Sequence, residues 1–301
     1  MKWKKKGLIF CPNKENEWMD NSFLQPTPIV LQDRIRIYGG IRDVEGVSRI
    51  GYVEIEKDDP SIVINVSRIP VLDIGENGMF DDNGVVPTSL VVIDNNIYLY
   101  YAGYTLGSKV RFRVFSGIAV SSDGGESFVR IQQHPVTDRV MGEELFRVIH
   151  SVVYDKGIYK FWYGGGNCFI QGKSKTLPVY DIRYMESKSI FEFPKEGIVA
   201  IPIADGEHRV GRPFVFLENN IFKMFYGYGS EEHPYRLAYA ESNDGIHWVN
   251  RNINIDLSCE GWDCEMMAYP SFVRVNGKGY LFYNGNNYGY NGFGYAELIE
   301  E

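Results

Sequence analysis

The segment Ile97-Tyr-Leu-Tyr-Tyr-Ala-Gly103 carries the pattern that decides the fold: an apolar start, a dense run of aromatic residues and a closing glycine. Aromatic and β-branched residues at this density favour a β-strand. The pattern recurs along the chain, and successive copies begin 62, 61, 63 and 58 residues apart. The other copies are Ile35-Arg-Ile-Tyr-Gly-Gly40, Ile158-Tyr-Lys-Phe-Trp-Tyr-Gly164, Ile221-Phe-Lys-Met-Phe-Tyr-Gly227 and Gly279-Tyr-Leu-Phe-Tyr-Asn-Gly285. Such a regular repeat of short strands is typical of β-propellers.

Each copy has the same neighbours in the sequence. A first apolar strand precedes it by about ten residues, and a third strand follows it. The first strands begin at Thr27, Thr88, Ser151, Pro213 and Pro270, and the third strands at Ser48, Ser116, Tyr180, Tyr235 and Gly292. With a fourth edge strand, such as 128–131, each repeat makes a four-stranded antiparallel blade. We therefore predict an all-β fold, a single five-bladed β-propeller domain spanning residues 1–301, in which radial closure protects the strand edges.

Composition excludes several classes of protein. The 301 residues include 15% aromatic residues and 32 glycines, and 31 basic against 39 acidic residues leave a net charge of −8. This charge argues against a nucleic-acid or membrane partner, since either would require a basic face. The apolar stretch Gly7–Cys11 is too short for the core of a signal peptide, so we expect a cytoplasmic protein. The four cysteines lack metal-ligand spacing, and we expect neither a metal nor a cofactor.

Two segments resemble the Asp-box turn of sialidases. They are Ser121-Ser-Asp-Gly-Gly-Glu-Ser-Phe128 and Ser242-Asn-Asp-Gly-Ile-His-Trp248. Asp and Gly at these places serve a tight turn between the third and fourth strands. We expect Asp123 and Asp244 to be structural residues on the outer rim.

The loops before the first strands and between the second and third strands meet at one face of a propeller, where function concentrates. Here these loops carry carboxylates together with Arg, Asn and aromatic residues. One carboxylic acid can protonate a glycosidic oxygen while a second activates water or attacks the anomeric carbon. Arg and Asn can hold hydroxyl groups, and Trp and Tyr can stack on sugar rings. The pattern therefore predicts a carbohydrate site.

The repeat and five short motifs resemble those of the invertase, levansucrase, arabinanase and mannoside-phosphorylase propellers. The nearest likeness is to the single-domain invertase-like proteins of bacterial surface-polysaccharide gene clusters, and it covers nearly the whole chain. The motifs are Trp18-Met-Asp20, Arg42-Asp43, Phe80-Asp-Asp82, Gly211-Arg-Pro213 and Trp262-Asp263. The resemblance implies a nucleophile or base at the entry of the first blade, where Asp20 stands. It also implies a general acid in the fourth blade, which maps to Glu207.

From these features we hypothesise that Glu207 is the general acid, its pKa raised by neighbouring carboxylates. Asp82 or Asp81 is its partner, as base or nucleophile, and Asp263 positions the sugar or tunes the pKa. The predicted substrate-binding residues are Arg42, Asp43, Arg209, Arg212, Trp262, Glu265, Tyr269, Asn284 and Asn286.

Two other functions stay open. In a glycosyl transferase or phosphorylase, Arg42, Arg209 and Arg212 would receive a phosphate or nucleotide-sugar group, and turnover by a phosphorylase would depend on phosphate. In a non-catalytic sugar-binding propeller, the carboxylates would lie more than about 10 Å apart. The sugar, the linkage, the stereochemical outcome and the oligomeric state are not determined by these patterns.

Overall fold

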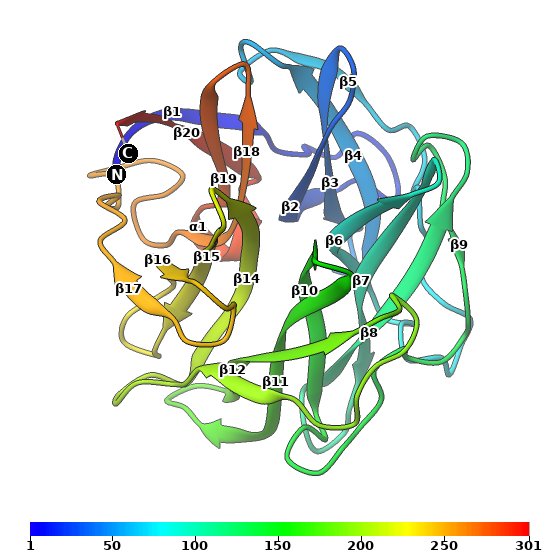
Figure 1. Ribbon diagram of the computed structural model, residues 1–301. Coiled ribbons are helices and arrows are strands. Elements are labelled where there is room, and N and C mark those ends of the chain that lie inside the picture. The colour runs from blue at the N-terminus through cyan, green and yellow to red at the C-terminus, as the bar shows by residue number, and fades with distance from the viewer. Residues whose placement is uncertain (301) are drawn as a thin grey trace.

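The computed structural model describes residues 1–300, and the chain is built almost entirely from strands (Figure 1). The expected all-β class is confirmed. Helix α1 (Asn286–Gly289) has only four residues, and within residues 1–300 no helix has the length and apolar character needed to cross a bilayer.

The strands follow one another in antiparallel groups of four. The first group is β2 (Asn21–Val30), β3 (Arg34–Arg42), β4 (Ser48–Glu56) and β5 (Val63–Val66). The second is β6 (Val85–Ile93), β7 (Asn96–Leu106), β8 (Phe112–Ser121) and β9 (Val129–Arg130). The third is β10 (Phe146–Asp155), β11 (Ile158–Gln171), β12 (Thr176–Ser187) and β13 (Ile198–Ile201). The fourth is β14 (Arg209–Glu218), β15 (Ile221–Gly229), β16 (Arg236–Ser242) and β17 (Val249–Arg251).

The last sheet joins the two ends of the chain. It consists of β18 (Ala268–Val275), β19 (Lys278–Asn284), β20 (Phe293–Glu300) and the N-terminal strand β1 (Lys2–Phe10). Strand β1 pairs antiparallel with β20, from Lys2 opposite Glu300 to Phe10 opposite Phe293. Figure 1 accordingly shows both termini side by side. The backbone hydrogen bonds of this sheet therefore tie the start of the chain to its end.

The first strand of every sheet lies near the centre of the molecule (Figure 1). Strand β2 contacts β6 and β18, β6 contacts β10, and β10 and β18 both contact β14. Short parallel pairings join neighbouring sheets, one of β8 with β10 and one of β12 with β14. Residues that are far apart in the sequence thus line one central axis.

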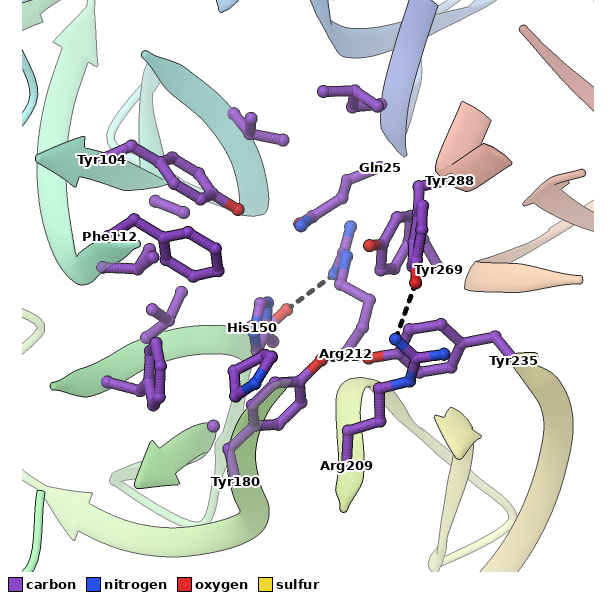
Figure 2. Close-up of a pocket in the computed structure, with 18 of the residues that line it drawn as sticks. Gln25, Tyr104, Phe112, His150, Tyr180, Arg209, Arg212, Tyr235, Tyr269 and Tyr288 are labelled. Atoms are coloured by element: carbon purple, nitrogen blue, oxygen red, sulfur yellow. Dashed lines mark hydrogen bonds between the residues drawn. The ribbon is translucent and has the colours of Figure 1, made fainter. Parts of the chain in front are cut away.

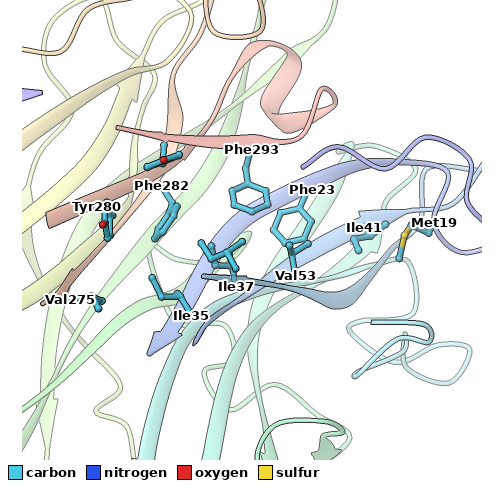
Figure 3. Packing of buried hydrophobic residues seen from close by; sticks show 12 residues of the cluster. Met19, Phe23, Ile35, Ile37, Ile41, Val53, Val275, Tyr280, Phe282 and Phe293 are labelled. Atoms are coloured by element: carbon cyan, nitrogen blue, oxygen red, sulfur yellow. The ribbon is translucent and has the colours of Figure 1, made fainter. Parts of the chain in front are cut away.

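Most aromatic residues of the repeated second strands are buried between sheets, as expected. Tyr100, Tyr101, Phe161, Trp162 and Tyr163 are all fully buried. Figure 3 shows one such core, where Phe23 and Ile37 of the first sheet meet Phe282 and Phe293 of the last. Burial of each large side chain contributes about 1.5–3 kcal/mol, so these aromatic residues hold the sheets together.

The expected structural role of the Asp-box residues is confirmed at Asp123. Its Oδ1 accepts hydrogen bonds from Ser121 Oγ at 2.6 Å and from the backbone N–H groups of Glu126 and Ser127. Burial alone would raise the pKa of Asp123, but the hydrogen bonds from Ser121 and Ser127 lower it to about 2. Asp244 makes the same turn with Ser242 and the N–H groups that follow it.

Candidate functional site

Every innermost strand has a register shift characteristic of a β-bulge near the start of its pairing with the second strand. The shifts lie between Leu24 and Thr27, Pro87 and Ser89, Ile149 and Ser151, Gly211 and Phe214, and Ala268 and Ser271. A bulge leaves a residue unpaired and re-aims its side chain. The residues concerned are Gln25, Thr88, His150, Arg212 and Tyr269, which we call the axial ring. They stand 63, 62, 62 and 57 residues apart, at the same place in every repeat.

Backbone strain marks three members of the axial ring. Gln25, Arg212 and Tyr269 have φ angles of 56°, 53° and 56°. Residues other than glycine rarely adopt this left-handed region, and such strain clusters at functional sites.

A cavity of about 250 Å³ opens at the axis, and four members of the axial ring line it: Gln25, His150, Arg212 and Tyr269. Around them lie cationic side chains and tyrosines (Figure 2). The cations are Arg42, Arg111, Lys175 and Arg209, and the tyrosines are Tyr104, Tyr180, Tyr235 and Tyr288. Within the described part of the chain, no Asp or Glu is among the residues that line this cavity.

Arg212 lies at the centre of the site and is 3% exposed. Its Nη1 donates to the backbone carbonyls of Thr88 at 2.9 Å and His150 at 3.2 Å, and its Nη2 donates to Thr27 Oγ1 at 2.9 Å. All three acceptors are neutral. Burial lowers the pKa of Arg212 to about 9, which leaves the guanidinium protonated at neutral pH. A cation without an acidic partner is therefore held in the middle of the fold.

Arg209 is held by aromatic residues instead. Its Nη1 donates to the Tyr288 hydroxyl at 2.8 Å, and its guanidinium lies 4.3 Å from the centre of the Tyr235 ring. The Tyr235 hydroxyl also hydrogen-bonds that of Tyr180. Burial raises the pKa of Tyr235 well above its usual value and that of Tyr104 to about 12. Tyr235 and Tyr104 are therefore neutral hydrogen-bonding groups at physiological pH.

Several buried polar atoms at the axis have no hydrogen-bond partner among residues 1–300. They are Gln25 Oε1, Thr88 Oγ1, His150 Nδ1, Arg209 Nε and Arg212 Nε. Burial, and then the charge of Arg212, hold the pKa of His150 well below its usual range, so this imidazole is neutral at pH 7. Leaving such atoms unpaired is costly, and a ligand in the cavity could satisfy those that face it.

Two of the predicted catalytic acids lie in buried ion pairs away from the cavity lining. Asp81 Oδ2 accepts from Tyr101 at 3.0 Å and from Arg130 Nε at 2.8 Å. Asp263 Oδ2 accepts from Tyr283 at 2.9 Å and lies 2.8 Å from Lys5 Nζ.

The third sheet repeats the arrangement with Glu143, whose Oε1 accepts from Tyr163 at 2.9 Å and from Arg183 at 2.8 Å. In each case the acid stands 20 residues before its tyrosine. We call Asp81–Tyr101, Glu143–Tyr163 and Asp263–Tyr283 the acid–tyrosine pairs.

The other predicted catalytic acids bond to their own loops. Glu207 Oε2 accepts from the Ala204 N–H at 3.3 Å, Asp82 Oδ2 accepts from the Gly78 N–H at 2.9 Å, and Asp20 Oδ2 accepts from Asn21 Nδ2 at 2.7 Å. None of these three carboxylates is among the residues that line the cavity. The structure does not gather the predicted acids there.

Of the predicted binding residues, Arg42, Arg209, Arg212 and Tyr269 do line the cavity. Asn284 does not line the cavity but fixes the backbone of β2 beside it. Its Oδ1 accepts from the backbone N–H of Gln25 at 2.8 Å, and its Nδ2 donates to the Phe23 carbonyl.

The remaining predicted binding residues lie elsewhere. Asp43 pairs with Arg49 at 2.7 Å, and Trp262 stacks on Tyr283 with ring centres 5.0 Å apart. The side chain of Asn286 accepts from the backbone N–H of Glu265, and Glu265 itself is exposed.

The sequence patterns missed Gln25, Thr88 and four tyrosines of the cavity: Tyr104, Tyr180, Tyr235 and Tyr288. Gln25 lies two residues before its expected first strand and Thr88 begins its own, so both could have been found by aligning the repeats around the starts of the first strands. Tyr180 and Tyr235 each begin an expected third strand, whereas Tyr288 lies in α1, outside the repeated pattern. In the described chain, no group of three or more His, Cys, Asp or Glu side chains is placed to hold a metal ion.

Comparison with solved structures identifies the architecture. A glycoside hydrolase matches with a TM-score of 0.75 and 17% identity over 99% of this chain and 92% of its own. A thermostable family-43 glycoside hydrolase matches with a TM-score of 0.70 and 17% identity over 93% and 90% of the two chains. A structure from the GH130 family of mannoside phosphorylases matches with a TM-score of 0.71 and 12% identity over 99% and 93%.

Comparison of sequences identifies the family. No protein-family model matches the chain. The uncharacterized protein Rv1502 of Mycobacterium tuberculosis is 30% identical over 302 aligned positions, which cover 99% of both chains. The chain therefore belongs to the same family as Rv1502, and its fold is that of the glycoside hydrolase-like propeller enzymes.

Proposed function

We propose that residues 1–301 form a single five-bladed propeller whose axial cavity binds carbohydrate. The antiparallel groups of four strands support the blade count, as do the contacts that run from β2 through β6, β10 and β14 to β18 and back. The cavity lies on this axis, and the similarity of the fold to glycoside hydrolases supports carbohydrate as its ligand.

The observation that carries the proposal is the lining of the cavity. Tyr180, Tyr235 and Tyr269 offer ring faces and edges for a sugar ring, while Arg and Lys side chains offer donors for its oxygen atoms. The volume of about 250 Å³ lies just below the range of about 300–1,000 Å³ that suits drug-sized ligands. The cavity therefore suits one sugar unit.

The lining favours recognition over hydrolysis by a pair of carboxylates. Such hydrolysis needs two carboxyl groups about 5–10 Å apart that flank the glycosidic bond, and the residues lining the cavity in the described chain include none. The catalytic roles of Glu207, Asp82, Asp81, Asp263 and Asp20 stay predictions. Asp81 and Asp263 have a structural explanation in their ion pairs.

The cations favour a second candidate function, in which phosphate takes part in glycosyl transfer or phosphorolysis. Hydrogenphosphate held by Arg209 and Arg212 would attack the anomeric carbon in place of the carboxylate of a retaining hydrolase. The glycosidic bond would break, the sugar would leave as a glycosyl phosphate, and the proton of the hydrogenphosphate would pass to the freed oxygen. Turnover of a glycoside that depends on added phosphate would distinguish this function from binding alone.

The first experiment is a screen of binding and turnover on a panel of mono- and oligosaccharides. We expect binding that Tyr235→Ala abolishes and Tyr154→Ala leaves unchanged, since Tyr154 is a 60% exposed residue of β10 outside the cavity. Absence of any sugar binding, or binding that is indifferent to Tyr235→Ala, would refute the proposal.

Glu207→Gln and Asp82→Asn test the predicted acids. Loss of turnover with folding retained would establish their catalytic roles. Turnover at the wild-type rate would exclude these two residues from the mechanism.

A further inference from the structure

We propose that the axial ring forms a subsite for an oxyanion, the carboxylate or phosphate group of an acidic sugar. This inference rests on the proposed function, because it names the class of carbohydrate that the cavity accepts. The residues that would receive the anion are Arg212 and Arg209, while His150 and Gln25 face the rest of the sugar.

The first argument is the charge balance of the site. Within residues 1–300, none of the cations that line the cavity forms an ion pair with a carboxylate: Arg42, Arg111, Lys175, Arg209 and Arg212. Buried arginines elsewhere do have such partners. Arg36 lies 2.7 Å from Glu54, and Arg147 lies 2.9 Å from Glu143. Of the five cations, only Arg209 and Arg212 are buried. A buried charge is costly unless it is paired, and for these two arginines the chain supplies no anion.

The second argument is the set of hydrogen-bonding atoms that lack partners. The Nε–H groups of Arg209 and Arg212 are buried donors, and neither has an acceptor in the described chain. His150 Nδ1 and Gln25 Oε1 are unpaired in the same cavity. Since an amide oxygen only accepts, Gln25 Oε1 suits a hydroxyl group of the sugar and not the anion itself. Figure 2 shows Gln25, His150 and Arg212 grouped at its centre. Two arginines with free Nε–H groups suit the planar or tetrahedral oxygens of a carboxylate or phosphate.

The third argument is rigidity. Hydrogen bonds from Arg212 reach β2, β6 and β10 and fix its guanidinium before any ligand arrives. The bulge and Asn284 fix the backbone of Gln25 in the same way. A site whose side chains are already ordered loses little conformational entropy on binding. Rigid cations of this kind discriminate against neutral sugars, which leave the charge of Arg212 uncompensated.

The experiment is calorimetric titration of the full chain with glucuronate, glucose 6-phosphate, glucose and inorganic phosphate. We expect at least one of the two acidic sugars to bind about 10–100-fold more tightly than glucose, since a charged hydrogen bond contributes about 1.5–3 kcal/mol. The difference between glucuronate and glucose 6-phosphate identifies the preferred oxyanion. Added salt should weaken binding of the acidic sugar and leave that of glucose unchanged.

Arg212→Gln should reduce the preference for the acidic sugar by about 10-fold or more, while the control Arg251→Gln, on the exposed strand β17, should not change it. If Arg212→Gln does not fold, Arg42→Gln at the edge of the cavity should reduce the preference in the same direction.

The outcomes separate the two proposals. Glucose binding as tightly as both acidic sugars would overturn the oxyanion subsite and leave the carbohydrate function standing. Inorganic phosphate binding in an Arg212-dependent manner, with no sugar bound, would support the subsite and refute the carbohydrate function. Absence of binding by all three anions would overturn the subsite.

Discussion

The acid–tyrosine pairs and the axial cavity differ in how buried charges are paired. At Asp81 a tyrosine hydroxyl and an arginine both bond the carboxylate, so acid and base are balanced within the chain. At Arg212 the guanidinium bonds only neutral oxygens, and no carboxylate lines the cavity in the described residues. Balanced charges hold sheets together, whereas unbalanced charges at a cavity indicate a ligand.

In every repeat that has both, the acid of the acid–tyrosine pair and the axial-ring residue lie close together in the sequence. Asp81 precedes Thr88 by seven residues, and Glu143 precedes His150 by seven. The acids turn back onto the second strand of their own sheet, and the axial-ring residues turn toward the axis. Two of the acids that the sequence places near the axis, Asp81 and Asp263, thus form ion pairs that hold the sheets together.

The largest expected effect is that of Asp81→Ala. Loss of the carboxylate leaves Arg130 and the Tyr101 hydroxyl without their partner. We expect the free energy of unfolding to fall by about 3 kcal/mol, at the lower end for breaking a buried ion pair, because Arg130 keeps some contact with solvent. Urea denaturation measures this, and sugar binding by the folded fraction should persist. Unchanged stability with lost turnover would instead support the role of base or nucleophile that the sequence predicts for Asp81 or Asp82.

Asp263→Ala should have a smaller effect on stability. Its partner Lys5 is more exposed than Arg130, with 24% of its side chain in solvent, so we expect a loss of about 2 kcal/mol. The pair joins the N-terminal strand to the loop before β18. Limited proteolysis should therefore detect earlier release of β1, with Asp256→Ala as the control. A variant as stable as the wild type would show that closure of the last sheet depends on strand pairing alone.

Arg212→Gln should change the stability of the ligand-free protein by less than about 1 kcal/mol. The substitution loses three hydrogen bonds worth about 1 kcal/mol each, but it also removes the cost of an unpaired buried charge. Thermal and urea denaturation without ligand measure the balance. A loss of unfolding free energy as large as that of Asp81→Ala would show that Arg212 stabilises the fold as the acid–tyrosine pairs do. The difference between the two regions would then be wrong.

The smallest expected effect is the pH dependence due to His150. Its pKa in the folded protein lies below the ordinary value of 6.5. The unfolded chain therefore binds the extra proton first, and stability falls as pH decreases below about 6.5. His150→Gln should flatten this part of the stability curve relative to the wild type. Burial also lowers the pKa of His208, so His208 contributes the same pH dependence of stability to the wild type and to His150→Gln. Identical curves for the two proteins would contradict the buried, neutral state of His150.

Much of the framework could be predicted from the sequence. The aromatic strands, their spacing and the Asp-box turns follow from local patterns, since alternation and turn residues act over a few positions. The 20-residue spacing of the acid–tyrosine pairs is present in the sequence, but the motifs around Asp81 and Asp263 predict catalytic roles for both. Their partners Arg130 and Lys5 lie 49 and 258 residues away, which local patterns do not connect.

The all-β class, the repeat and the burial of its aromatic residues follow from local sequence patterns, because these features depend on short-range periodicity and on the hydrophobic effect. Which charged side chains meet depends on the tertiary structure. Arg212 bonds Thr88 and Thr27 across 124 and 185 residues, and bulges that change the direction of single side chains bring the axial ring together. Electrostatic balance depends on such long-range neighbours, which is why Asp81 and Asp263 form structural ion pairs while Arg209 and Arg212 have no acidic partner in the described chain.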